Sequence, residues 1–167
     1  QAAMNGLIAA ARQFWNVPDG VEVVPAPGAS SLIVRMPMLT DMYRINIPQP
    51  TYNEHARAFR MAGSDVTDDP EASVLVLVHP NNPDGALWGE EAIGGRPLTI
   101  IDESFCDVMP EESHIALTVE DGVVVLKSFG KFWGLAGVRL GFAIGTRETL
   151  TGPEGYLGDL LGPWAVS

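Results

Sequence analysis

The chain contains the stretch Ser128-Phe-Gly-Lys131-Phe-Trp-Gly-Leu-Ala-Gly-Val-Arg139-Leu-Gly-Phe142, in which one lysine lies among glycines and apolar residues. A hydroxyl group precedes this lysine by three positions and a guanidinium follows it by eight. Apolar neighbours remove water from an ammonium group and favour its neutral, nucleophilic form. We therefore expect a desolvated lysine amine here, with flanking side chains from Phe132, Trp133, Leu135 and Ala136.

A neutral lysine amine forms a Schiff base with the aldehyde of pyridoxal 5'-phosphate. Ser128 and Arg139 would hold the phosphate of the same molecule. The stretch therefore indicates a pyridoxal phosphate site centred on Lys131. The alternative is a glycine-rich loop between two strands with an incidental lysine, because short motifs also occur by chance.

Composition restricts the class of protein. The chain has 167 residues with 46% hydrophobic content, which is enough for one globular domain with a core. Ten basic and 21 acidic residues give a net charge of -11, which disfavours nucleic acid or an anionic membrane as the main partner. The single cysteine, Cys106, excludes an internal disulfide and is interpreted as an apolar filler. With no membrane-length apolar run and no signal-peptide pattern in residues 1–20, we expect a cytoplasmic protein.

The hydrophobic pattern alternates between helical and extended segments. Helical spacing covers residues 3–15, 28–36 and 53–62, and short apolar or alternating runs cover 21–24, 43–47, 74–78, 98–101, 123–126 and 138–144. Almost purely apolar runs are typical of strands covered on both faces. The pattern predicts an α/β fold with a mostly parallel sheet of about seven strands and helices on both faces.

Two features indicate a piece of a longer protein. Residues 85–97 leave room for only a short helix, although a parallel crossover usually takes a dozen or more residues. The chain also begins inside a helical pattern and stops at 163–167 without an obvious closing element. We expect residues 1–167 to form one domain of a larger enzyme.

Polar residues follow the expected strands, where open α/β sheets bind ligands. Asp102 comes directly after the run 98–101, and a buried carboxylate needs a cation or several donors. A protonated pyridine nitrogen would supply that cation and keep the ring an electron sink. The alternative is that Asp102, or its neighbour Glu103, caps the following turn.

Three more segments add candidate ligands. In His79-Pro-Asn-Asn-Pro-Asp-Gly85, Asn82 is the candidate donor to the ring hydroxyl, although such dipeptides are common in ordinary turns. Gly28, Ala29 and Ser30 open a helix whose amides and hydroxyls would bind phosphate, unless the serines only cap it. Tyr52 would stack on a planar ring, or is a structural tyrosine.

The three histidines show no metal-ligand spacing, so no metal site is expected, and His79 is interpreted as structural.

In order and approximate spacing, five motifs resemble the class I/II pyridoxal phosphate enzymes of fold type I: Gly28-Ala-Ser30, Pro50-Thr-Tyr52, Pro80-Asn-Asn-Pro83, Asp102-Glu103 and Ser128-x-x-Lys131-x7-Arg139-x-Gly141. The branch they resemble contains histidinol-phosphate aminotransferases and threonine-phosphate decarboxylases. The resemblance spans nearly all of the chain and implies an aspartate-aminotransferase-like large domain, with the small domain missing.

The resemblance also implies roles for single residues. Lys131 would carry the cofactor covalently, Asp102 would pair with the ring nitrogen, and Asn82 would donate to the ring hydroxyl. Tyr52 would stack on the ring. The phosphate would be held by Ser128, Arg139, Ser30 and the amides around Gly28 and Ala29.

Phe105 stands where aminotransferases commonly have a tyrosine, and Asp84 and the ending Leu161-Gly-Pro-Trp-Ala-Val-Ser167 also resemble the decarboxylases. The resemblance thus favours decarboxylation of a small phosphorylated amino acid, L-threonine O-3-phosphate, to aminopropanol phosphate in cobalamin biosynthesis. A histidinol-phosphate-type aminotransferase is the alternative. Because the usual carboxylate-binding arginine lies in the small domain, a non-catalytic remnant is a third interpretation. The family also implies a homodimer.

Overall fold

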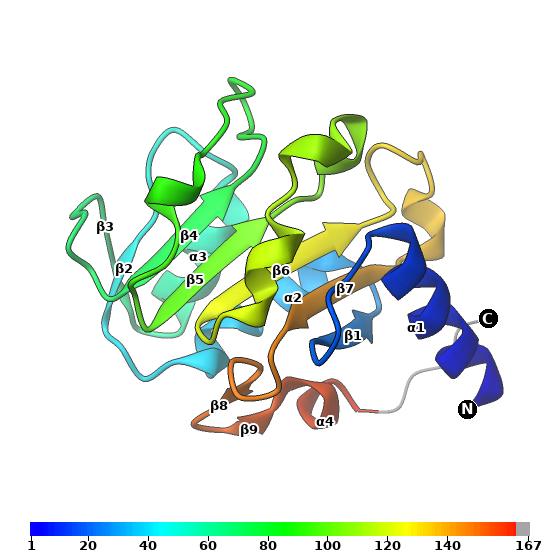
Figure 1. Cartoon of the computed structure of the whole chain (residues 1–167). Coiled ribbons are helices and arrows are strands. Elements are labelled where there is room, and N and C mark those ends of the chain that lie inside the picture. The colour runs from blue at the N-terminus through cyan, green and yellow to red at the C-terminus, as the bar shows by residue number, and fades with distance from the viewer. Residues whose placement is uncertain (163–167) are drawn as a thin grey trace.

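The computed structural model describes residues 1–162 (Figure 1). Its helices are α1 (Ala2–Phe14), α2 (Ala29–Ile33), α3 (Asn53–Met61) and α4 (Leu157–Leu161). Its strands are β1 (Glu22–Ala26), β2 (Arg44–Asn46), β3 (Asp65–Thr67), β4 (Val74–Val78), β5 (Leu98–Asp102), β6 (Val123–Ser128), β7 (Gly141–Gly145), β8 (Thr151–Gly152) and β9 (Gly155–Tyr156). Six short 3-10 turns connect them: η1 (Met36–Leu39), η2 (Glu90–Ala92), η3 (Cys106–Val108), η4 (Pro110–Glu112), η5 (Ile115–Val119) and η6 (Ala136–Val138).

Seven strands form one mixed sheet in the order β1-β7-β6-β5-β4-β2-β3. The strands from β6 to β3 along this order are parallel, while β7 runs antiparallel to both β6 and β1. The predicted α/β fold with a mostly parallel sheet of about seven strands is confirmed. Because β1, β4, β5 and β6 run in the same direction, their carboxyl ends lie along the same edge of the sheet.

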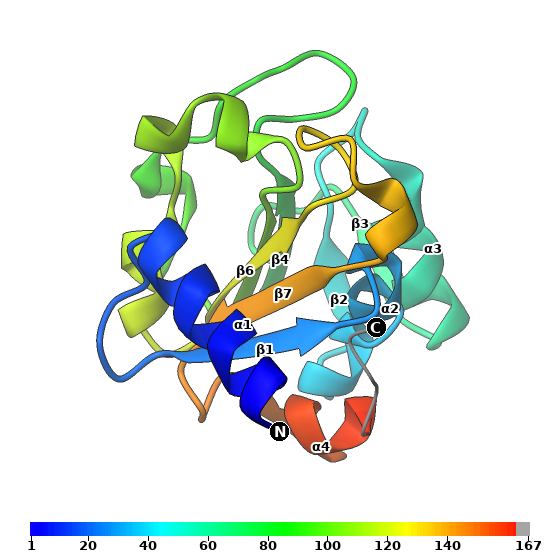
Figure 2. The same ribbon diagram turned by 90° about the vertical axis from the view of Figure 1, so that its right-hand side faces the viewer.

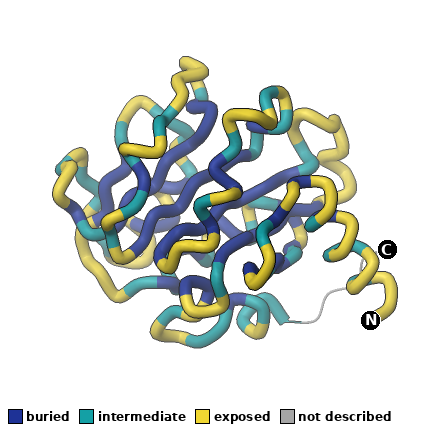
Figure 3. The backbone as a smooth tube through the Cα atoms, in the orientation of Figure 1, coloured by how far each residue is buried: buried dark blue, intermediate teal, exposed yellow. Residues whose placement is uncertain are grey.

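Both faces of the sheet are covered, because successive side chains of a strand point to opposite faces. Figure 2 shows α1 on one side of the sheet and α2 and α3 on the other. Val76, Ile100 and Val124 pack with α2 and α3, whereas Leu77, Ile101 and Val125 pack with α1 and the 3-10 turns. Figure 3 shows the central strands buried and most connections exposed, so the core lies within the sheet layers.

Several predicted segments differ from the structure. Residues 85–97 contain only the 3-10 turn η2. The side chain of Trp88 covers this part of the sheet instead: it packs on the core, and its Nε1 atom donates to the Val78 carbonyl oxygen at 3.1 Å. The helix predicted over 28–36 divides into α2 and η1, with Pro37 in the first turn of η1. The last strand predicted from the sequence, over 138–144, begins only at Gly141 and is β7. The backbone of Arg139 has a left-handed conformation, with φ 53°, and this interrupts the extended chain.

The sequence pattern missed β3, which has only three residues at the edge of the sheet, and the elements β8, β9 and α4. These last elements follow the sheet directly, and Leu157 of α4 is fully buried against it. Residues 163–167, which contain most of the predicted family-like ending, lie outside the described residues.

Gly141 lies where the start of α2 crosses β7, and its register partners are Ala26 and Ser128. A Cβ atom at Gly141 would lie 2.7 Å from the Ala29 nitrogen and 2.9 Å from the Gly28 carbonyl carbon. Since both contacts are with backbone, a side chain here would push α2 away from the sheet.

We predict that Gly141→Ala lowers the free energy of unfolding by roughly 1–3 kcal/mol through overpacking. Gly137→Ala is the matched control, because its Cβ would meet no atom within 4 Å; its effect should stay within about 0.5 kcal/mol. Urea denaturation measures both values. Equal losses in the two variants would contradict the packing argument.

Candidate functional site

A pocket of about 170 Å³ lies at the edge of the sheet where the parallel strands end. The segment after β1, the ends of β4, β5 and β6, and the start of α3 all contribute to its lining. Crevices at the carboxyl ends of parallel strands are the usual ligand sites of such sheets.

The structure brings all nine residues that the sequence singled out to the lining of this one pocket. They are Gly28, Ala29, Ser30, Tyr52, Asn82, Asp102, Ser128, Lys131 and Arg139. Phe105 lines the same pocket, and the Lys131 Nζ atom lies 5.8 Å from the centre of its ring. Five separate segments of the sequence therefore converge on one cavity.

One end of the pocket is suited to an anion. The Arg139 guanidinium packs against Gly28, where an added Cβ would lie 3.5 Å from the Arg139 Cζ atom. Gly28 N donates to the Ala26 carbonyl and Ser31 N to that of Gly28. The amides of Ala29 and Ser30 lie in the first turn of α2, where no intrahelical acceptor is available, and they have none among the turn and loop backbone hydrogen bonds of residues 1–162. No side chain caps α2, which removes the serine-cap alternative for this segment. Free amides beside a guanidinium form a phosphate-binding arrangement.

Asp102 is a buried carboxylate with donors on both oxygens. His55 Nε2 lies 2.7 Å from its Oδ2, and Ser104 donates to Oδ1 from its amide at 3.0 Å and its hydroxyl at 2.5 Å. Burial raises the pKa of Asp102, but hydrogen bonding and charge interaction with His55, together with the hydrogen bonds from Ser104, outweigh it and hold the pKa below its usual value. Asp102 is therefore ionised.

Of the two kinds of partner expected for this buried carboxylate, a cation or several donors, the described residues provide the donors. The chain itself provides His55 and Ser104, and the Ser104 amide contact means that Asp102 also caps the turn that follows β5. A cation on a ligand would add one more interaction to a carboxylate whose position His55 and Ser104 already fix.

His55 is the site residue that sequence reasoning missed, having considered it only as a metal ligand. It is fully buried in α3, and its Nδ1 atom has no hydrogen-bond partner among the described residues. Since an ionised carboxylate only accepts, Nε2 carries the proton in this contact. The sequence did carry one signal that His55 is buried. His55 lies four positions before the apolar Phe59, and residues at i and i+4 share one face of a helix.

The expectation that apolar flanks desolvate the Lys131 amine is wrong for this chain. Lys131 is exposed, and Phe132, Trp133 and Leu135 are themselves 49%, 40% and 47% exposed. Trp133 is held by residues distant in sequence, since its Nε1 atom donates to Asp107 Oδ2 at 3.0 Å and its ring packs against Phe14 of α1. Adjacency in sequence does not make these side chains the walls of the lysine's environment.

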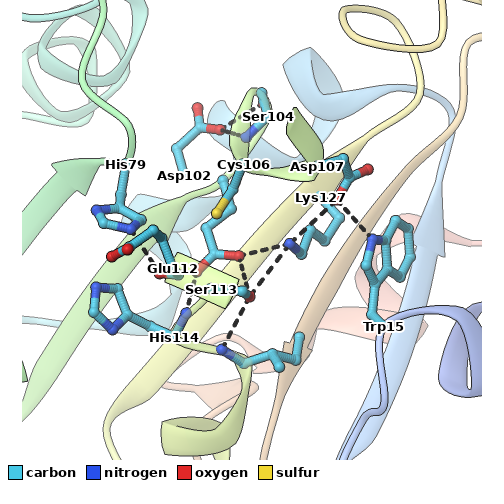
Figure 4. A network of polar contacts seen from close by, with 12 residues as sticks. Trp15, His79, Asp102, Ser104, Cys106, Asp107, Glu112, Ser113, His114 and Lys127 are labelled. Carbon is cyan, nitrogen blue, oxygen red and sulfur yellow. Dashed lines mark hydrogen bonds and ion pairs between the residues drawn. The ribbon is translucent and has the colours of Figure 1, made fainter. Parts of the chain in front are cut away.

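A buried polar network lies on the opposite face of the sheet (Figure 4). Glu103 accepts from Lys127 Nζ, Ser113 Oγ and the His114 amide, each at 2.6 Å. Asp107 extends the network by accepting from Trp15 Nε1 at 2.9 Å. Lys127 is 1% exposed and ion-paired, so it is unavailable to a ligand in the pocket. The Glu103 side chain accepts from the His114 amide eleven residues further along the chain, and within residues 1–162 it makes no hydrogen bond with the turn directly after β5 that it was expected to cap.

Other polar residues have structural roles. His79 Nε2 donates to the Glu112 carbonyl at 2.8 Å, and its Nδ1 accepts from the Trp88 amide at 3.1 Å. Cys106 is buried, and burial raises the pKa of its thiol to about 12, as fits an unreactive filler. Within residues 1–162, no three potential ligands cluster to hold a metal, and no helix is long and apolar enough to cross a bilayer.

Comparisons with known proteins connect this site to a family. Residues 64–155 match the family described as aminotransferase class I and II. The chain is 36% identical to a threonine-phosphate decarboxylase of Pseudomonas aeruginosa over 98% of its own length and 52% of the relative's. It is 38% identical to a threonine-phosphate decarboxylase of a Sinorhizobium species, over 89% of this chain and 49% of that one. The chain therefore spans about half the length of the curated relatives it matches.

A solved structure shares the fold. Histidinol-phosphate aminotransferase from Sinorhizobium meliloti, in complex with pyridoxal 5'-phosphate, superimposes with a TM-score of 0.72 at 20% identity, covering 85% of this chain and 46% of that one.

We predict that His55→Leu destabilises the protein by about 1.5–3 kcal/mol at neutral pH, because the charged Asp102 loses a hydrogen bond. Because the pKa of Asp102 is lower in the folded protein than its ordinary value of 3.8, the ionised carboxylate stabilises the fold fully at pH values above 3.8. This contribution is lost as the pH falls through the folded-state pKa. Without His55 the folded-state pKa rises, so the difference between variant and parent shrinks on acidification. Urea denaturation at a series of pH values tests this.

The matched control is His55→Gln, which keeps a nitrogen donor in place of Nε2 and should retain much of the stability. A His55→Leu deficit that is the same at every pH would show that packing, not the carboxylate contact, is responsible.

Proposed function

Because this chain belongs to the aminotransferase class I and II family, we propose that its pocket holds pyridoxal 5'-phosphate, bound covalently to Lys131. The observation that carries the proposal is the convergence of all nine sequence-predicted residues on one pocket. The donor set fits the cofactor. Free amides at Ala29 and Ser30 beside Arg139 suit a phosphate, and an ionised carboxylate at Asp102 suits a protonated ring nitrogen.

The order of strands supports the orientation. Of the anion-binding groups, Ala29 and Ser30 follow β1, and Arg139 precedes β7. Asp102 ends β5 and Asn82 follows β4, and both of these strands lie on the other side of β6. A molecule with a phosphate at one end and a ring at the other would lie along this edge, with Lys131 reaching it from the loop after β6.

When bound, the cofactor supplies an electron sink for the bond broken at the substrate's α-carbon. Asp102 would keep the proton on the ring nitrogen, and His55 and Ser104 would keep Asp102 oriented and charged. Asn82 would donate to the ring hydroxyl, and Tyr52 would cover one ring face. The Lys131 amine would hold a proton on Nζ for transfer to or from the substrate's α-carbon.

We further propose that the whole protein decarboxylates L-threonine O-3-phosphate to aminopropanol phosphate, a step of cobalamin biosynthesis. Two relatives of 36% and 38% identity bear the name threonine-phosphate decarboxylase, and Phe105 in the lining supports the same branch. Asp84 is weaker support, because it has a structural contact with Asn81. The terminal motif lies outside the described residues.

Two other functions remain as alternatives. Transamination is the second candidate, because the family that matches residues 64–155 is described as aminotransferase class I and II. A non-catalytic remnant is the third candidate, since Lys131 and Arg139 are the only cations in the described lining and neither is free to bind a substrate carboxylate if both hold the cofactor. A homodimer would bring further groups to the site, and the exposed Phe132, Leu135 and Val138 beside the pocket support such an interface.

Borohydride reduction of the protein with pyridoxal 5'-phosphate should label Lys131. Peptide mass mapping identifies the site of label. Lys127 is the internal control, since it is buried in an ion pair and should stay unlabelled. Label on another lysine, or none in the presence of saturating cofactor, would refute the assignment.

Incubation with O-phospho-L-threonine should release carbon dioxide while the cofactor stays in its aldehyde form. Gas release and the cofactor's absorption spectrum are measured together. Full conversion of the cofactor to its amine form by histidinol phosphate or glutamate, without carbon dioxide, would instead favour the aminotransferase. Inertness toward all these substrates in a folded protein would favour the remnant.

A further inference from the structure

Asn81 is a buried residue that takes no part in the pocket lining, yet it lies beside it. Its side chain is 7% exposed, and it immediately precedes Asn82. An amide buried to this degree is stabilising only when its polar atoms are paired. Its partners therefore indicate what it holds together.

The Asn81 side chain bonds to one segment that is distant in sequence, residues 50–51, and to Asp84 in its own turn. Its Oδ1 atom accepts from Thr51 Oγ1 at 2.6 Å, and its Nδ2 atom donates to the Pro50 carbonyl at 3.0 Å and to Asp84 Oδ1 at 2.8 Å. A carbonyl and an ionised carboxylate only accept, so the amino group must face Pro50 and Asp84. Both amino hydrogens and the amide oxygen are thus used.

The backbone of Asn81 closes the turn that carries Asn82. Asn81 N donates to the Ala86 carbonyl and Gly85 N donates to that of Asn81, each at 2.8 Å. Asp84 Oδ1 also accepts from the Ala86 amide at 3.0 Å, and hydrogen bonds from this amide and from Asn81 lower the pKa of Asp84. The turn is therefore held in one conformation around Asn81.

These contacts connect two walls of the pocket. Thr51 directly precedes Tyr52, and Asn81 directly precedes Asn82, and both Tyr52 and Asn82 line the pocket. The hydrogen bond between Thr51 and Asn81 therefore lies one residue before each of these two lining residues and joins positions 30 apart in sequence.

We propose that Asn81 is a positioning residue that fixes Tyr52 relative to Asn82, and thereby sets the geometry in which the ring of the cofactor is held. This inference rests on the proposed function only for the identity of the ligand. Asn81 itself touches no ligand and acts through Thr51 and the turn 80–86.

The test compares three variants of the protein. Asn81→Leu has nearly the same size and removes every side-chain contact, while Thr51→Val removes only the hydroxyl donor and keeps the test open if Asn81→Leu fails to fold. Thr118→Val is the matched control, because Thr118 Oγ1 also makes a buried 2.6 Å hydrogen bond, to the Ile115 carbonyl, away from the pocket.

Two readouts are combined. Hydrogen exchange without cofactor should be faster in segments 50–53 and 80–86 together in Asn81→Leu, and slightly faster in Thr51→Val. Titration with pyridoxal 5'-phosphate should show a dissociation constant raised roughly ten-fold in Asn81→Leu, and by less in Thr51→Val. The absorption spectrum of the bound cofactor should change with it, because the contact to the ring hydroxyl is displaced. Thr118→Val should match the parent in cofactor affinity and spectrum.

Faster exchange in both segments with parental affinity and spectrum would overturn the proposal, since Asn81 would then be only structural. Faster hydrogen exchange in segment 80–86 with unchanged exchange in segment 50–53 would also overturn the proposal, because the two segments would then not be coupled through Asn81. Failure of the parent itself to bind pyridoxal 5'-phosphate would instead refute the proposed function and any cofactor positioning with it, while the exchange data would still report the coupling of the two segments.

Discussion

The buried charge of Asp102 is the constraint on which the site depends. A carboxylate at the end of a central strand is stable only if hydrogen bonds replace the water it has lost. The chain meets this requirement with His55 from α3 and Ser104 from the following turn. The packing of α3 on the sheet and the course of the chain after β5 are thereby tied to the same side chain that faces the pocket.

The two-residue period of the strands separates this site from a second polar system. Asp102 and Ser128 line the pocket, while their neighbours Glu103 and Lys127 belong to a network on the other side of the sheet. That network also reaches the loop of Lys131, because Asp107 binds Trp133. One face thus presents groups to a ligand, and the other anchors the segments that carry them.

Much of the fold follows from local pattern. The apolar runs of β4, β5 and β6 identify buried strands, and the predicted bounds of α1 and α3 agree with the structure to within about one or two residues. Short elements were less predictable: β3 has three residues and no apolar run, and between β4 and β5, where the sequence left room for only a short helix, the structure has the 3-10 turn η2. In these segments, packing of side chains such as Trp88 decides the backbone, and local propensity does not.

By itself, the sequence determined the class of fold, the order of the motifs and nine of the residues that line the pocket, because these depend on side-chain type, spacing and the convergence of strand ends. Only the tertiary structure decided which side chains hold those residues. Asp102 meets His55 across 47 positions and Thr51 meets Asn81 across 30, and neither pair has a periodic signal. It also decided that Lys131 lies in an exposed loop and that Trp133 packs with Asp107 and Phe14, because these contacts join residues far apart in sequence.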